Sequence, residues 1–274
     1  MNDLIIVRGG GDIATGTIYK LHQCGFDVLV LEIDESSAIR RRAAFCEAVY
    51  SGSQTVEGIT CRAAESVEEA EELLKNEGIA LMVDPQGSVI KKLHPLAVVD
   101  AIIAKKNLGT NRDMADITIG LGPGFCAGDD VDAVIETMRG HDLGRVIYEG
   151  CAMENTGVPG SIAGHAADRV IHSPASGVFR SRRNIADIVE AGDIIAVVDT
   201  GDGEVPVRAS MDGLLRGILH DGYRVDAGTK AADIDPRKEE HDNCFTISDK
   251  ARCIAGGVLE AILHLKGQKN DICG

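Results

Sequence analysis

Short apolar runs alternate with amphipathic stretches along the first 150 residues of the chain. Residues 4–7 form a continuous apolar run, which suits a strand buried on both faces of a parallel sheet. Residues 13–24 carry apolar side chains at helical spacing and end at Gly25, and residues 27–32 form a second apolar run. The pattern predicts one strand-helix-strand unit.

The same alternation continues beyond this unit. Further helices are predicted over residues 38–50, 65–77, 95–106 and 129–138, and further strands over residues 79–84, 116–121 and 145–148. Regular alternation of helix and strand favours a Rossmann-like doubly wound parallel sheet, so the fold class predicted for this half is α/β.

The residue pattern of the chain changes after residue 150, from alternating helices and strands to turns and short strands. Residues 155–160 are rich in turn-forming residues, and short β-branched runs replace long helices from residue 170 onward, so a domain boundary is expected between 155 and 170. The sequence also repeats at an offset of 36 residues, because 177–180 matches 213–216 and 189–192 matches 225–228. Such a repeat predicts two copies of one β unit.

The duplicated pattern resembles the β barrel-sandwich hybrid of biotinyl and lipoyl carrier domains. In a carrier the hairpin between the two halves presents a modifiable lysine, but residues 199–204 contain none, so a docking surface is favoured over a carrier role. Residues 248–265 are expected to form a helix with one apolar stripe. The predicted domains are a Rossmann-like nucleotide- or cofactor-binding domain at 1–160, a duplicated β module at 168–240 and a C-terminal helix at 245–268, docked on the first domain.

Composition narrows the classes of partner. The formal net charge is −15, so a nucleic-acid or anionic-membrane partner is not expected, since the overall field repels polyanions. No segment approaches the ~20 apolar residues that span a bilayer, and residues 1–3 lack the basic start of an export signal. A cytoplasmic protein is expected, and self-association into a homo-oligomer is left open.

The eight cysteines show no C-x-x-C pair and no zinc-type spacing. Neither a metal site nor a disulfide framework is predicted, and buried packing is favoured for Cys126 and Cys151 over a reactive thiolate. The histidines likewise show no ligand spacing and are expected at the surface or in hydrogen bonds.

The first candidate site is the glycine-rich turn between the first strand and helix. In Gly9-x-Gly11-x-x-Ala14, the first glycine permits the turn, the second lets a phosphate approach, and the alanine permits close packing, while the helix N-terminus supplies amide donors. Glu32 ends the second strand, where a carboxylate can accept hydrogen bonds from a ribose. A glycine turn kept only for packing remains the alternative.

Two further groups belong to the predicted edge of the sheet. Arg40 and the two arginines after it are interpreted either as a phosphate clamp or as a solvated helix face. A second glycine-rich loop, at residues 120–125, ends another predicted strand. Asp129 and Asp130 beyond it are expected to cap a helix, and the alternative is a carboxylate pair that holds a metal or takes a proton. The predicted cofactor-binding residues are Gly9, Gly10, Gly11, Asp12, Ile13, Ala14, Glu32, Arg40, Gly122 and Gly124.

Four segments carry a family resemblance. Residues 7–16, 43–50, 121–125 with 136–141, and 244–251 resemble the selenium-dependent molybdenum hydroxylase system protein family (YqeB type) over nearly the whole chain. The first domain is also similar to the Rossmann domain of XdhC-type xanthine dehydrogenase accessory proteins. The resemblance implies a maturation role, in which the protein binds a molybdopterin-type cofactor and modifies or inserts it into an apo molybdenum hydroxylase.

The resemblance also draws attention to Cys244. It precedes a predicted helix start and Lys250, and both features are expected to lower the pKa of its thiol, so Cys244 is the candidate catalytic residue, with packing as the alternative. Two other functions stay open. One is an NAD-dependent oxidoreductase, with NAD(H) or another nucleotide as the cofactor, and the other is a non-catalytic partner protein whose glycine turn is structural.

Overall fold

The computed structural model describes residues 3–157 and 164–273, and the predicted boundary at residue 160 lies outside them. The chain forms two compact units. The first contains residues 1–36, 44–156 and 247–274, and the second contains residues 37–43 and 157–246. Each unit has a hydrophobic core of its own.

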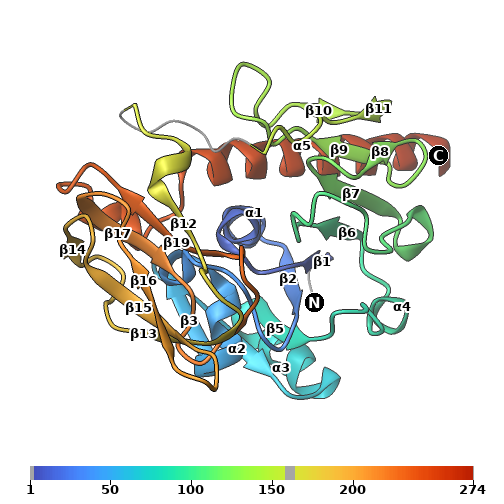
Figure 1. Cartoon of the computed structure of the whole chain (residues 1–274). Helices are drawn as coiled ribbons and strands as arrows, with labels where there is room; N and C mark the ends of the chain where they lie inside the picture. The colour runs from blue at the N-terminus through green and yellow to red at the C-terminus, as the bar shows by residue number, and fades with distance from the viewer. Residues whose placement is uncertain (1–2, 158–163, 274) are drawn as a thin grey trace. The chain divides into compact units, whose positions relative to one another are not determined.

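A nine-stranded mixed sheet forms the centre of the first unit (Figure 1). Its strand order is β10-β9-β7-β6-β1-β2-β5-β4-β3. All neighbours pair in parallel except the edge strands β3 and β10, which pair antiparallel. The strands are β1 (Leu4–Arg8), β2 (Asp27–Glu32), β3 (Ser53–Val56), β4 (Ile59–Ala64), β5 (Ile79–Val83), β6 (Ala97–Asp100), β7 (Ile117–Leu121), β9 (Ala133–Ile135) and β10 (Val146–Ile147), and a separate two-stranded sheet joins β8 (Cys126–Ala127) to β11 (Gly150–Cys151).

Helices cover both faces of this sheet. On one face α1 (Asp12–Gln23), α2 (Ala48–Ser51) and α5 (Asp249–Cys273) share a core with side chains such as Ile5 and Val7, and on the other α3 (Val67–Glu77) and α4 (Ile90–Leu93) pack against residues such as Ile6. Glycine permits the contact between α1 and α5, because a Cβ at Gly16 would lie 2.8 Å from the main chain of Ala251. α1 begins shortly after the end of β1, so its N-terminus lies at the carboxyl edge of the parallel strands.

The second unit consists of two four-stranded antiparallel sheets. Their orders are β12-β19-β17-β14 and β16-β15-β13-β18. The strands are β12 (Val170–His172), β13 (Gly177–Ser181), β14 (Ile188–Val189), β15 (Ile194–Asp199), β16 (Glu204–Arg208), β17 (Gly213–Ile218), β18 (Arg224–Val225) and β19 (Lys230–Asp235). The offset of 36 residues seen in the sequence recurs in the strand starts, since β13, β14 and β15 correspond to β17, β18 and β19.

The predicted fold class, a Rossmann-like doubly wound parallel sheet followed by a barrel-sandwich hybrid module, is wrong. The large sheet is mixed, and three predicted helices are absent. Residues 95–106 contain strand β6, residues 129–138 contain strand β9, and residues 38–50 contain two single-turn 3-10 helices, η1 (Arg41–Ala43) and η2 (Phe45–Glu47), before α2. Only α1 and α3 make full helical crossovers, because short apolar runs in the remaining segments pair as buried strands.

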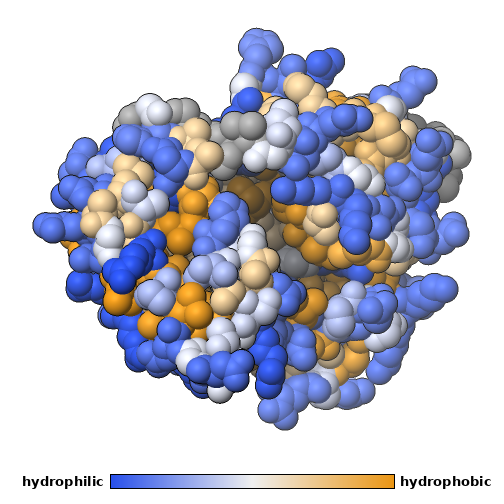
Figure 2. All heavy atoms as spheres, in the orientation of Figure 1, coloured by the Kyte–Doolittle hydropathy of each residue, from blue (hydrophilic) through white to orange (hydrophobic). Residues whose placement is uncertain are grey.

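Within the described chain no helix is both long enough and apolar enough to cross a membrane. Charged and polar side chains cover most of the face shown in Figure 2, and apolar atoms appear there in patches between them. This surface agrees with a chain that carries 43 acidic and 28 basic residues.

Candidate functional site

The glycine-rich turn follows β1 at the carboxyl edge of the parallel strands. Gly9 has φ +93°, and a Cβ there would lie 3.0 Å from the Cα of Ile102. A Cβ at Gly10 would lie 3.0 Å from the main-chain nitrogen of Cys46, which donates a hydrogen bond to the Gly10 carbonyl at 2.8 Å. The first two glycines are therefore required by contacts with neighbouring loops, independently of any ligand.

Gly11 differs from its two neighbours. Nothing lies within 4 Å of the position a Cβ would take at Gly11. Gly11 is also the N-cap residue of α1, with φ −63° and ψ 177°, and as a glycine it has no side chain with which to cap the helix. The first N–H groups of a helix lack intrahelical partners and carry the positive end of the helix dipole. Open space beside Gly11 thus adjoins a helix end that favours an anion.

The other predicted members of this turn have separate places. Asp12 begins α1 and is partly buried, Ile13 packs against the core, and Ala14 is completely buried. The small side chain of Ala14 permits α1 to pack closely on the sheet.

Glu32 closes the turn from the end of β2. One carboxylate oxygen accepts the N–H of Gly10 at 2.7 Å, and the other accepts the N–H of Ile33 at 2.9 Å. Burial raises the pKa of Glu32, and these two hydrogen bonds oppose that shift. In this structure the carboxylate that was predicted to meet a ribose holds the glycine turn in place.

Lys250 brings positive charge to the same edge. It lies in the first turn of α5, and its pKa is lowered by burial and by the neighbouring Arg139 guanidinium, while Asp12 and Glu136 act in the opposite direction. Arg139 forms a two-bond ion pair with Asp249, at 3.0 and 3.1 Å. Sequence reasoning missed Lys250 as a site residue, because one lysine in a helix start carries no distinguishing signal.

Packing explains both glycines predicted in the second loop. Gly122 has φ +76°, and a Cβ there would lie 2.4 Å from the Thr137 hydroxyl. Gly124 has φ +106°, and a Cβ there would lie 2.6 Å from the Cα of Lys106. The loop is therefore held against its neighbours. The helix expected after it is absent, and Asp130 instead accepts the N–H of Cys126 at 2.9 Å.

A buried polar network also lies at the carboxyl edge and has no counterpart in the predicted site. The Arg8 guanidinium lies 3.6 Å from the Asp100 carboxylate and donates to the Thr110 hydroxyl, which itself donates to Asp100 at 2.6 Å. Arg8 also donates to the Pro85 carbonyl at 3.0 Å. This network joins β1 to β6 and to the loops that follow β5 and β6.

Two predicted residues belong to the second unit. Arg40 donates to the carbonyls of Asn243 and Thr246, at 2.9 and 3.4 Å, so its guanidinium holds main-chain oxygens there. Cys244 ends the 3-10 helix η5 (His241–Cys244) and is fully buried in the second core. The expectation of a lowered pKa is wrong, since burial raises the pKa of Cys244 and outweighs the opposing effect of Arg40 and Arg216.

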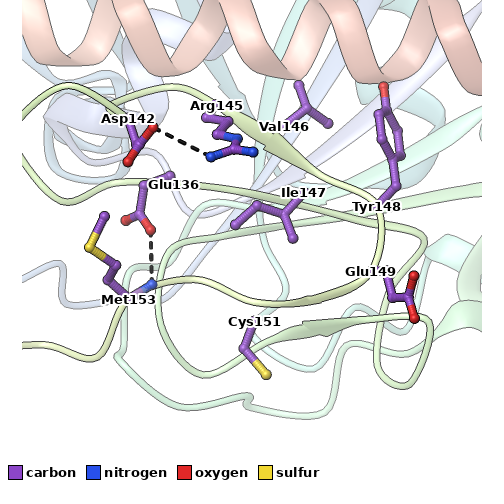
Figure 3. A pocket seen from close by; sticks show the side chains of 9 residues that line it. All are labelled: Glu136, Asp142, Arg145, Val146, Ile147, Tyr148, Glu149, Cys151 and Met153. Atoms are coloured by element: carbon purple, nitrogen blue, oxygen red, sulfur yellow. Dashed lines mark hydrogen bonds and ion pairs between the residues drawn. The ribbon is translucent and has the colours of Figure 1, made fainter.

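Cys126 and Cys151 correct a second expectation. They form a disulfide that joins β8 to β11, although the sequence suggested separate buried thiols. Cys151 is exposed and Cys126 is half-buried. Cys151 also lines a cavity of about 370 Å³, shown in Figure 3. The other lining residues are Glu136, Asp142, Arg145, Val146, Ile147, Tyr148, Glu149 and Met153.

Among residues 3–157 and 164–273, no group of three or more His, Cys, Asp or Glu side chains is arranged to hold a metal ion. The groups at the carboxyl edge that are suited to a ligand are main-chain amides and ammonium or guanidinium groups, which favour anions.

Comparisons with known proteins give one relative in sequence. No family model matches the chain. The chain is 52% identical over 268 residues to the uncharacterized protein YqeB of Escherichia coli (strain K12), which covers 97% of this chain and 48% of YqeB. The chain thus spans about half the length of the curated relative that it matches.

The solved structures show only weak likeness. An aspartoacylase family protein from Mesorhizobium loti has a TM-score of 0.29 at 10% identity, covering 85% of this chain and 84% of that one. A succinylglutamate desuccinylase/aspartoacylase from Rhodobacter sphaeroides has a TM-score of 0.28 at 13% identity, covering 85% of each chain. Scores this low assign neither a fold nor an activity to this chain.

These findings correct the expected family and role. The curated relative is described as uncharacterized, and no family model, including any for molybdenum hydroxylase accessory proteins, matches the chain. The predicted assignment to the molybdenum hydroxylase system with an XdhC-type Rossmann domain is therefore wrong, and so is the maturation role drawn from it. The oxidoreductase and partner-protein alternatives gain no support from the comparisons.

Proposed function

We propose that the first unit binds a phosphate-bearing small molecule of the nucleotide class at the N-terminus of α1. The observation that carries this proposal is the open space at Gly11. Its neighbours Gly9 and Gly10 are closed off by main-chain contacts, whereas nothing approaches within 4 Å of a Cβ position at Gly11. A phosphate can approach the main chain there and accept hydrogen bonds from the first N–H groups of α1.

The charges around this position favour an anion that enters a focused site. Lys250 supplies an ammonium group near the start of α1, where its lowered pKa reflects incomplete solvation. A bound phosphate would offset the cost of holding that charge away from water. Its negative charge would also reduce the electrostatic repulsion between Lys250 and Arg139. Asp12 opposes the anion, so the helix dipole and Lys250 must together outweigh one carboxylate.

Thermal unfolding in the presence of nucleotides tests this proposal. The panel consists of AMP, ATP, NAD and inorganic phosphate, each at millimolar concentration with the full chain. We expect at least one nucleotide to raise the melting temperature, because a ligand at 100 times its Kd stabilises the folded state by about 2.7 kcal/mol. If no member of the panel raises it, the proposal is overturned.

Gly11→Asp and Gly11→Ser form a matched pair for the same assay. Both side chains can cap α1, because Gly11 already has the extended N-cap conformation, so both variants should be at least as stable as wild type without ligand. Only aspartate places a negative charge in the proposed phosphate position. We expect Gly11→Asp to abolish the nucleotide shift and Gly11→Ser to retain part of it. Equal shifts in wild type and Gly11→Asp would contradict a phosphate at this helix end.

We also propose that the protein acts in the cytoplasm. Five cysteines of the described chain are free, namely Cys24, Cys46, Cys61, Cys244 and Cys253. Proteins of oxidising compartments seldom keep so many free thiols. Fractionation of cells that express a tagged chain tests this location, and recovery of the protein outside the cytoplasmic fraction would contradict it.

A further inference from the structure

The cavity of Figure 3 has one carboxylate that is not neutralised by its surroundings. Glu136 accepts the N–H groups of Met138 and Met153, at 2.7 and 2.8 Å, and Asp142 lies 3.5 Å from the Arg145 guanidinium. Glu149 forms no ion pair within the described part of the chain and is exposed. The exposed carboxylate of Glu149 is therefore available to pair with a cation near Cys151.

Cys151, one half of the Cys126–Cys151 disulfide, belongs to the wall of the same cavity. Cys151 lies two positions after Glu149, lines the cavity and is exposed, whereas Cys126 is half-buried. A thiolate attacks the sulfur that it can reach, so a thiol held in this cavity meets Cys151 first.

We propose that Cys126–Cys151 is a thiol-exchange site, and that its reductant is a small aminothiol whose ammonium group is held by Glu149. This inference concerns a cavity and a reaction that the proposed nucleotide site does not use.

The exchange balances in two steps. The aminothiol, as its thiolate, attacks Sγ of Cys151, the Cys126–Cys151 bond breaks, and Cys126 leaves as a thiolate that takes up a proton. A second aminothiol then attacks the sulfur of the first in the mixed disulfide, and Cys151 leaves in the same way. Two thiols are thus oxidised to one disulfide, and the protein disulfide is reduced to two thiols.

Reduction changes what holds this part of the cavity wall. Without the covalent bond, β11 stays attached to β8 by a two-residue ladder, and the chain just after it is held by the hydrogen bond from Met153 to Glu136. The disulfide formed from the two aminothiols can reoxidise Cys126 and Cys151 by the same exchange run in reverse.

Three thiols of similar size and different charge test the inference. They are cysteamine, which is cationic, 2-mercaptoethanol, which is neutral, and 3-mercaptopropionate, which is anionic. The rate at which each reduces Cys126–Cys151 in the native full chain is measured by acid quench, alkylation and peptide mass spectrometry. Each rate is divided by that of the same thiol with a neutral small-molecule disulfide, which removes differences in intrinsic reactivity. Peptide mapping separates this disulfide from the free thiols of Cys24 and Cys253.

We expect the corrected rate for cysteamine to exceed that for 3-mercaptopropionate by about fivefold. The Glu149 carboxylate attracts the cationic thiol and repels the anionic one, and each of these exposed charge interactions is weak. Glu149→Gln should reduce this ratio of corrected rates two- to threefold, because it removes the charge that distinguishes the two thiols. Glu72→Gln is the matched control, since Glu72 is exposed on α3 at the other end of the sheet and its loss should leave the ratio unchanged.

The position of the trapped mixed disulfide gives an independent readout. Rapid quenching should place the thiol on Cys151 and leave Cys126 free. Equal corrected rates for the three thiols, a thiol trapped mainly on Cys126, or reduction only after denaturant has unfolded the chain would each overturn the inference.

Discussion

The carboxylate of Glu32 accepts the main-chain N–H of Gly10 at 2.7 Å, so the end of β2 is tied to the turn that follows β1. The second carboxylate oxygen accepts the N–H of Ile33. Two neighbouring strands thereby fix the conformation of the turn before any ligand arrives.

Replacement of Glu32 by alanine should destabilise the protein. It leaves the buried N–H of Gly10 without its acceptor, which costs about 1–3 kcal/mol, and it also removes the acceptor of the more exposed N–H of Ile33. Denaturant unfolding of Glu32→Ala measures this cost. Glu35→Ala, at an exposed position, serves as the control and should change stability by less than about 0.5 kcal/mol. An unchanged unfolding free energy for Glu32→Ala would show that the tie is dispensable.

The glycines of the turn should respond differently to a methyl group. Gly9→Ala forces a side chain into the left-handed region and against Ile102, and it should cost about 2–3 kcal/mol. Gly11→Ala meets open space at an ordinary φ, so its unfolding free energy should stay within about 0.5 kcal/mol of wild type. The comparison uses denaturant unfolding of both variants without ligand. Similar costs at the two positions would contradict the assignment of Gly11 as the open position.

Lys250→Met should raise stability while weakening the proposed anion site. Burial lowers the pKa of Lys250, which means that the folded protein disfavours its charge, and removal of that charge should raise the melting temperature by roughly 1–3 °C at pH 7. The sign follows because a lysine with a depressed pKa binds its proton more tightly in the unfolded chain. Lys75→Met on the exposed side of α3 should change neither property. A Lys250→Met variant that loses stability, or that keeps a full nucleotide shift, would contradict this account.

The Asp235–Arg237 pair predicts a pH dependence in the second unit. Burial acts to raise the pKa of Asp235, but hydrogen bonds from Arg237, at 2.9 and 2.8 Å, lower it overall. The stabilisation by this depressed pKa is complete above the unfolded value and is lost as pH falls through the folded one. Arg237→Ala should therefore cost about 1 kcal/mol at pH 7, and the cost should shrink on acidification below about pH 4.

Arg180→Ala is the control for that measurement. Arg180 lies 3.8 Å from Asp221, and both side chains are largely exposed, so its loss should have little effect at either pH. Unfolding free energies of the two variants at pH 7 and pH 3 give the comparison. A cost for Arg237→Ala that stays constant between these pH values would contradict the assigned role of Asp235.

The sequence predicted the elements whose pattern was long or well punctuated. The segments of β1, α1 and β2 were predicted within one or two residues of their ends, because a buried run, a glycine cluster and a terminal Gly25 mark them. Residues 95–106 were predicted as a helix but contain β6. Their apolar run is too short for periodicity to separate a buried helix from a strand, and the parallel pairing of β6 with both β1 and β7 decided the outcome.

The candidate site was predicted only in part. The position of the glycine turn follows from local sequence, but the acceptor for Gly10, the ammonium of Lys250 and the Cys126–Cys151 bond depend on residues far apart in the chain. Spacing rules for cysteines detect frameworks and metal motifs, and an isolated pair separated by 25 residues matches neither. Tertiary contacts of this kind leave no periodic trace in one sequence.

The two repeats of the second unit exchange strands. β14, from the first copy, pairs with β17 of the second, and β18, from the second copy, pairs with β13 of the first. One copy alone would therefore lack a pairing partner for two of its strands, and only a second copy could supply those partners. A chain cut in the hairpin at residues 199–204 should yield two fragments that fold only when mixed, and a single-repeat ancestor would have had to work as a dimer of identical chains.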